Sequence, residues 1–126
     1  MPFPVDMQWI REAEEKLQAK LPQSYVDFMC RSNGGEVETA VCAWDLYPVW
    51  DKSNRKTLAR TCNDIVRETE QAKNWTGFPS DAIAIAANGY GDQLILMPND
   101  QTVYAWDHET GEMVAQADDF AKIISS

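Results

Sequence analysis

The chain has 126 residues, 44% hydrophobic and 25% charged, a composition typical of one globular domain (residues 1–126) with a sizeable core. Its eleven basic and twenty acidic residues give a net charge of −9, and no apolar run approaches the roughly 20 residues that a membrane-spanning helix needs. Only residues 52–73 carry a net positive charge, which disfavours direct nucleic-acid binding, because that needs a basic face.

Residues 1–35 are predicted to form two short helices. Asp6 is a candidate N-cap for the first, and Pro22 suits the first turn of the second. Asn33-Gly34-Gly35 then supplies residues that tolerate positive φ and end a helix. The apolar positions at helical spacing are Trp9, Ile10, Ala13 and Leu17 in the first helix, and Tyr25, Phe28 and Met29 in the second.

Residues 37–51 are rich in β-branched and aromatic side chains, which favours strands, with Pro48 at a strand edge or end. Ser53 or Asn54 is expected to cap a third helix. Its basic residues should be mostly on the solvent side. The predicted apolar face of that helix comprises Leu58, Cys62, Ile65, Val66 and Ala72.

The last third of the chain has a clear β pattern. Residues 82–87, 93–98 and 102–107 are predicted strands separated by the turn signals "NGYGD" and "ND". "HETGE" is the next turn, residues 113–116 a short further strand, and "DDFAKII" a closing helix led by Asp118 or Asp119. Because the late strands have hairpin-length links, the fold class is α+β, with a mainly antiparallel sheet and helices packed around it.

Three segments, in this order along the chain, resemble those of the SUKH superfamily, the Smi/Knr-type domain named after yeast cell-wall regulators. They are "LPQSYVDFMCRSNGG", "FPSDAIAIAANGYGDQLILMP" and "VYAWDHETGE" followed by "DDFAKII", whereas residues 37–75 match only in outline. The resemblance implies an α+β fold with a largely antiparallel sheet. It also implies that bacterial members act as immunity proteins that bind and neutralise a toxin, whereas the larger fungal relatives are regulatory interaction proteins.

The only histidine, His108, lies between Asp107 and Glu109. Neighbours on a strand point to opposite faces, so these three cannot converge on one ion unless the chain bends there. One histidine and scattered cysteines do not predict a metal site, and no nucleophile signature accompanies the histidine, so no catalytic residue is assigned. "NGYGD" leads into a strand, not into a helix, so it does not predict a phosphate or other cofactor site. We expect a strand end in which Asp107 holds the turn.

Aromatic residues beside carboxylates suit a protein-binding patch, although about half of the tryptophans are expected in the core. The candidate partner-binding residues are Trp44, Asp45, Tyr47, Trp50, Asp51, Tyr90, Asp92, Tyr104, Trp106, Asp107 and Glu109. The expected partner is a cationic toxin domain, such as a nuclease, held by stoichiometric occlusion without catalysis, membrane or small-molecule substrate. The alternatives are a regulatory interaction module with another protein partner and a small enzyme that uses His108.

Cys30, Cys42 and Cys62 lie far apart without CxxC spacing, and the N-terminal residues do not resemble a signal peptide. These features predict reduced, buried thiols and a cytoplasmic location.

Overall fold

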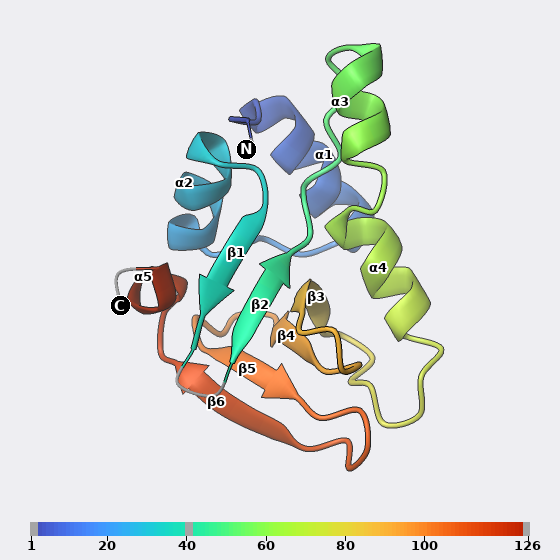
Figure 1. Cartoon of the computed structure of the whole chain (residues 1–126), viewed down its shortest axis with the longest axis vertical. Helices are drawn as coiled ribbons and strands as arrows, with labels where there is room; N and C mark the ends of the chain where they lie inside the picture. The colour runs from blue at the N-terminus through green and yellow to red at the C-terminus, as the bar shows by residue number, and fades with distance from the viewer. Residues whose placement is uncertain (1–2, 40–41, 125–126) are drawn as a thin grey trace.

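The computed structural model describes residues 3–39 and 42–124. In the described part, an antiparallel sheet of six strands is surrounded by five helices (Figure 1). The elements are α1 (Met7–Leu17), α2 (Gln23–Arg31), β1 (Gly35–Glu38), β2 (Ala43–Leu46), α3 (Arg55–Arg60), α4 (Ile65–Ala72), β3 (Ile83–Ala87), β4 (Gln93–Leu96), β5 (Val103–Trp106), β6 (Met113–Ala117) and α5 (Phe120–Ile124). The predicted α+β class is confirmed.

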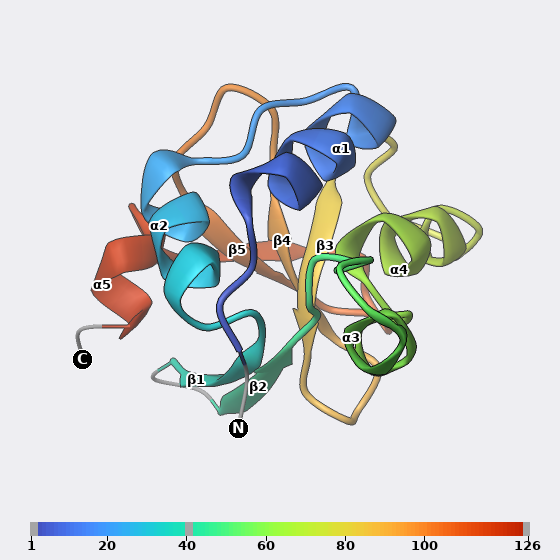
Figure 2. The same cartoon turned by 90° about the horizontal axis from the view of Figure 1, so that it is seen from above.

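The six strands follow one another across the sheet in chain order, and each pairs with its neighbours in antiparallel fashion. β2 and β3 share only two paired positions and one further hydrogen bond, from the N–H of Tyr47 to the carbonyl of Ile85 over 2.8 Å, so the first part of β3 has no strand beside it on that side. There, Thr69 of α4 satisfies the backbone of β3: its hydroxyl oxygen accepts a hydrogen bond of 2.9 Å from the backbone N–H of Ala84. The sheet curls, and α5 contacts both β1 and β6 (Figure 2).

Strand side chains alternate between two hydrophobic clusters, because successive side chains of a β-strand point to opposite faces of the sheet. On one face of the sheet, Ile85 and Leu94 belong to the larger cluster, which also holds the buried residues of α1, α2 and α5. On the other face, Ile95 and Trp106 pack with Phe78 and the last turn of α4. Both faces of β3 and β4 are therefore buried, which accounts for their almost continuous apolar sequence.

The first two helices and the closing turns agree with the sequence prediction. Asp6 occupies the N-cap position of α1, Pro22 that of α2, and Gly34 and Gly35 have φ values of 113° and 97°. At the other end, the Asp119 carboxylate accepts the N–H of Ala121 and so begins α5.

The predicted third helix is wrong as a single element, because the chain forms two helices there. Asn54 caps α3 through a capping box, and the Asp64 side chain accepts the N–H groups of Val66 and Arg67 to begin α4. The chain turns between the two helices, so Leu58 and Cys62 are exposed instead of sharing an apolar face with Ile65. The basic residues Arg55, Lys56, Arg60 and Arg67 are exposed, as predicted.

The cysteines are less buried than the sequence prediction states. Cys62 is exposed, and Cys30 and Cys42 are half-buried. All three are free thiols in this structure. Among the described residues, no helix is long and apolar enough to cross a membrane.

Candidate functional site

The structure divides the predicted partner-binding residues into three groups. The first group is buried, so the prediction that its residues contact a partner is wrong: Trp44 is 2% exposed, Trp106 1% and Asp51 6%. Trp44 and Trp106 lie in the two hydrophobic clusters, and the Asp51 carboxylate accepts the backbone N–H of Ser53. These three residues stabilise the fold and offer no surface to a partner.

The second group is half-buried, and its polar atoms are bonded within the protein. The hydroxyl of Tyr47 donates to the side-chain oxygen of Gln93, and that of Tyr104 donates to the Asp100 carboxylate, each over 2.7 Å. The indole N–H of Trp50 donates to the carbonyl of Leu58. Burial raises the pKa of Tyr47 to about 12. These side chains keep part of their surface free but are held in fixed positions.

The third group lies in two adjoining turns at one end of the sheet. Tyr90 and Asp92 belong to the turn between β3 and β4, and Asp107 and Glu109 to the turn between β5 and β6. We call the described residues 88–92 and 107–112 the turn surface. Asp45, the remaining predicted residue, is exposed on β2 and lies opposite Glu36 of β1.

An Asp92–His108 contact joins the two turns. Nδ1 of His108 lies 2.7 Å from Oδ1 of Asp92, which also accepts the backbone N–H of His108. The hydrogen bond with Asp92 raises the pKa of His108. Burial would raise the pKa of Asp92, but hydrogen bonds from His108 and Asn88 together lower it. Each partner thus stabilises the charged form of the other.

Asp107 holds its own turn, as the sequence predicts. Its Oδ1 accepts the backbone N–H groups of Glu109 at 2.8 Å and Thr110 at 3.3 Å. The bend brings ligand atoms of Asp92, Asp107 and His108 within 4.8 Å of one another, a convergence that the reasoning from a straight strand missed. The third ligand comes from the neighbouring turn. These carboxylates already accept backbone N–H groups, and the absence of a metal site stays a prediction.

A cavity of about 470 Å³ opens beside the turn surface. Its walls are formed by Asn74, Trp75, Thr76, Gly91, Trp106 and His108. The exposed ring of Trp75 stacks on that of the buried Trp106, with centroids 6.0 Å apart and an angle of 13° between the rings. Sequence reasoning did not select Trp75, although a tryptophan in the polar loop "KNWTG" is a signal that could have found it.

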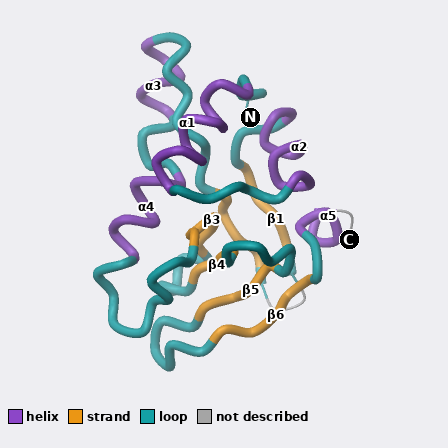
Figure 3. Tube along the Cα trace, turned by 180° about the vertical axis from the view of Figure 1, so that it is seen from behind, coloured by secondary structure: helices purple, strands orange, loops and turns teal. Residues whose placement is uncertain are grey.

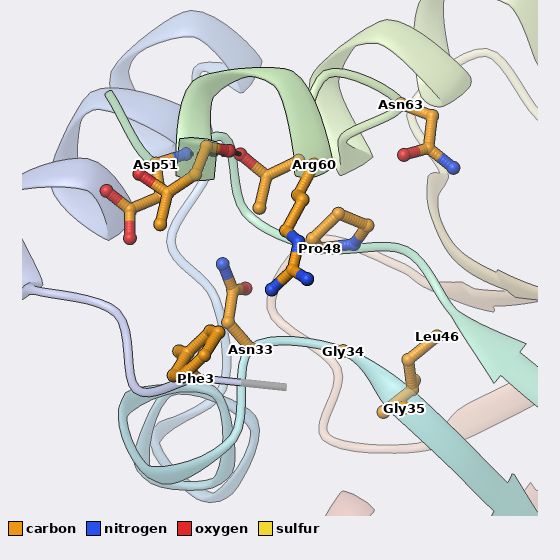
Figure 4. A pocket seen from close by; sticks show the side chains of 11 residues that line it. Phe3, Asn33, Gly34, Gly35, Leu46, Pro48, Asp51, Arg60 and Asn63 are labelled. Carbon is orange, nitrogen blue, oxygen red and sulfur yellow. Dashed lines mark hydrogen bonds between the residues drawn. The ribbon is translucent and has the colours of Figure 1, made fainter. Parts of the chain in front are cut away.

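A second cavity, of about 260 Å³, lies below α3 (Figure 4). The Arg60 guanidinium projects into it and lies 5.7 Å from the centre of the Phe3 ring. Asn33 forms part of its floor and binds both backbone groups of Val49 through its amide. This cavity is bordered by the basic helix α3, whereas the turn surface is acidic.

The described ring nitrogen contacts of His108 are with carboxylates: Nδ1 with Asp92, and Nε2 with Glu109 at 4.0 Å. The geometry therefore suits a rigid, charged surface for recognition.

The chain matches the SMI1/KNR4 family (SUKH-1) over residues 4–126. The protein belongs to this SUKH family. A search of curated proteins found no match. The family match includes the turn surface and, apart from Phe3, the walls of both cavities, and it covers residues 37–75, where the motifs alone match only in outline.

Proposed function

We propose that this SUKH domain is an immunity protein that binds a toxin and neutralises it by occlusion, without catalysis and without a cofactor. The observation that carries the proposal is the family match over residues 4–126. A protein–protein interaction is the function that this family suggests, and a toxin partner is the more specific step that we propose.

The distribution of charge supports a cationic partner. Residues 74–126 carry one basic and eight acidic residues, whereas α3 presents Arg55, Lys56 and Arg60 to solvent. In Figure 1, α3 lies at the top of the molecule and the turn between β5 and β6 at the bottom. This separation gives the protein an acidic end and a basic end, and such a field orients a charged partner during its approach.

The turn surface also offers contact area. Tyr90 is 79% exposed, and Trp75 is exposed at the nearby cavity. Tyrosine and tryptophan are frequent anchors in protein interfaces, because they bury a large area at a small entropic cost. Glu109, whose side chain is 80% exposed, adds charge at the rim.

The first experiment is co-expression with the product of the neighbouring gene. The proposal expects that gene to encode a large multidomain protein with a variable C-terminal domain, and expects this chain to rescue cell growth and to co-purify with that domain. Rescue without a complex, or a toxic domain that is neither bound nor inhibited, would overturn the proposal. A stable complex with a protein that is not toxic would instead support a regulatory interaction module.

The second experiment tests the electrostatic part with variants that leave the fold intact. Asp45→Asn combined with Glu109→Gln removes two exposed charges, neither of which caps a helix or turn. We expect the association rate with the toxin domain to fall by about threefold to tenfold and its salt dependence to weaken. The control, Glu15→Gln with Glu70→Gln, removes two exposed charges on α1 and α4 and should change the rate less. Equal effects of the two pairs would contradict a directed contact.

The enzyme alternative is tested by His108→Ala. An occluding protein should lose only part of its affinity through this change, because the two turns lose their connection. Hydrolysis or transfer by the purified protein that disappears in the variant would overturn the proposal in favour of catalysis.

A further inference from the structure

The outer edge of β6 is open to solvent next to the turn surface. β6 is the last strand of the sheet, and in Figures 1 and 3 it is the outermost one. α5 follows it after a short link and contacts it, but the first part of the strand extends away from that helix. Met113, Val114 and Ala115 are all exposed, and Val114 is 56% exposed.

The backbone groups that face outward can be assigned from the ladder. The N–H of Asp107 donates to the carbonyl of Glu112 over 2.9 Å, and the register then pairs Ala105 with Val114. Antiparallel ladders alternate between hydrogen-bonded and non-bonded pairs, so Val114 bonds to β5, and Met113 and Ala115 direct their N–H and C=O groups outward. Two outward residues at a spacing of two can receive one further strand.

This edge lacks the features that normally prevent pairing. Proteins protect edge strands with lysine, proline, inward charges or bulges. The sequence of β6, "MVAQA", contains no charged residue and no proline. Its register shift lies opposite Val103 and Tyr104, at the end near α5, so residues 113–115 remain a regular strand.

The charges around the edge indicate which strand it can receive. Glu109 and Glu112 precede β6, and Asp118 and Asp119 follow it. Lys122 forms an ion pair with Asp118 over 2.7 Å, and Nε2 of His108 lies 4.0 Å from Glu109, so Glu112 and Asp119 have no basic partner among the described ion pairs. Opposite charges across paired strands stabilise a sheet, which favours an added strand with basic residues.

A second copy of this chain fits this edge poorly. An antiparallel pair of β6 strands would bring together two edges that are both flanked by acidic residues, Glu112 before the strand and Asp118 after it. Like charges directly opposite each other destabilise a sheet, and each copy carries a net charge of −9.

We propose that β6 is a docking edge that receives an extended basic segment of the protein partner as a seventh strand. The inference rests on the proposed function only in taking the partner to be a protein. The outward groups of Met113 and Ala115 would supply main-chain hydrogen bonds, and Glu109 and Glu112 would contact basic side chains at one end of the added strand.

A peptide experiment tests the edge independently of any toxin. The probe is a short capped peptide that alternates lysine with valine, and the matched control peptide alternates glutamate with valine. In NMR titrations of the full chain, the basic peptide should shift the amide signals of Met113 and Ala115 most and slow their hydrogen exchange, and the acidic peptide should leave them unchanged. Shifts that are equal for both peptides, or that lie elsewhere on the protein, would overturn the proposal. So would a change in oligomeric state that reveals self-pairing.

Three substitutions at one position separate backbone pairing from other effects. Ala115→Pro removes an outward N–H and should weaken binding of the basic peptide by about tenfold. Ala115→Lys keeps the N–H but adds a positive charge that repels the basic peptide. It should weaken binding less than Ala115→Pro does, and the loss should be larger at low salt, where charges are screened less. Ala115→Val keeps the N–H and adds no charge, so it should bind the basic peptide as the parent chain does. If circular dichroism shows that Ala115→Pro is misfolded, the Ala115→Lys and Ala115→Val variants still test the proposal, because equal peptide binding by these two would refute the charge argument.

Discussion

Asn33→Ala tests why the Asn-Gly-Gly segment is needed in this fold. The Asn33 amide donates from Nδ2 to the carbonyl of Val49 over 2.8 Å, and its Oδ1 accepts the N–H of Val49 over 2.7 Å. Both residues are buried. One side chain therefore satisfies both backbone groups of a residue that has left the sheet, and the alanine variant leaves these groups without a partner.

The cost follows from the burial of those two groups. A buried backbone donor or acceptor that loses its partner costs about 1–3 kcal/mol, so the variant should lose about 3 kcal/mol of the free energy of unfolding when some water enters the vacated space. In a domain of this size, each kcal/mol corresponds to roughly 4 °C in Tm, so Tm should fall by about 12 °C.

Urea denaturation followed by tryptophan fluorescence measures this loss, with Gln23→Ala as the control. Gln23 also donates an amide hydrogen bond, to Asp27 over 2.8 Å, but at the surface of α2. The control should lose no more than about 0.5 kcal/mol. A loss of less than about 1 kcal/mol in Asn33→Ala, or an equal loss in both variants, would refute the reasoning that burial makes this contact valuable.

Three further variants probe the turns and the core. Asp92→Asn should lower the pKa of His108 towards its ordinary value in an NMR pH titration, and an unchanged titration would contradict the contact. In the parent chain the pKa of His108 is raised, so the contact stabilises the fold below that pKa and this stabilisation fades as the pH rises through it. At the acid end it is lost when Asp92 becomes protonated. Gly91→Ala should cost about 1–3 kcal/mol in urea denaturation, since φ is +101° and a Cβ would lie 3.1 Å from the His108 ring; a neutral result would show that the turns can separate freely. Tyr25→Phe should leave the free energy of unfolding unchanged or raise it by up to about 1 kcal/mol, because the buried hydroxyl has no hydrogen-bond partner among the described residues, and a clear loss would reveal one.

Much of the fold could be predicted because the local signals agree with one another. The short, almost continuous apolar runs of β3 and β4, the β-branched and aromatic residues of β5 and the turn residues between them identify the strands, and the family resemblance is confirmed over residues 4–126. The third helix was the exception. Asn54 and Asp64 are both good N-cap residues, and periodicity alone does not show that the chain begins a second helix at Asp64.

The candidate site was harder to predict because face and neighbourhood depend on tertiary structure. A tryptophan followed by an aspartate on a strand points to the opposite face from that aspartate, so Trp44 is buried while Asp45 is exposed. The contact between Asp92 and His108 joins residues sixteen positions apart, and no local pattern indicates it. Trp75 was missed because the cavity beside it is formed by three separate segments.

The position of α5 has a consequence for how the protein is made. Because the strands occur in chain order, each hairpin can form as soon as its second strand leaves the ribosome. The core is incomplete until Phe120 arrives, since its ring packs edge-on against Tyr25 and Phe28 of α2 and α5 contacts both β1 and β6. Until then the nascent chain exposes the apolar face of its second helix, and such a surface is prone to aggregation.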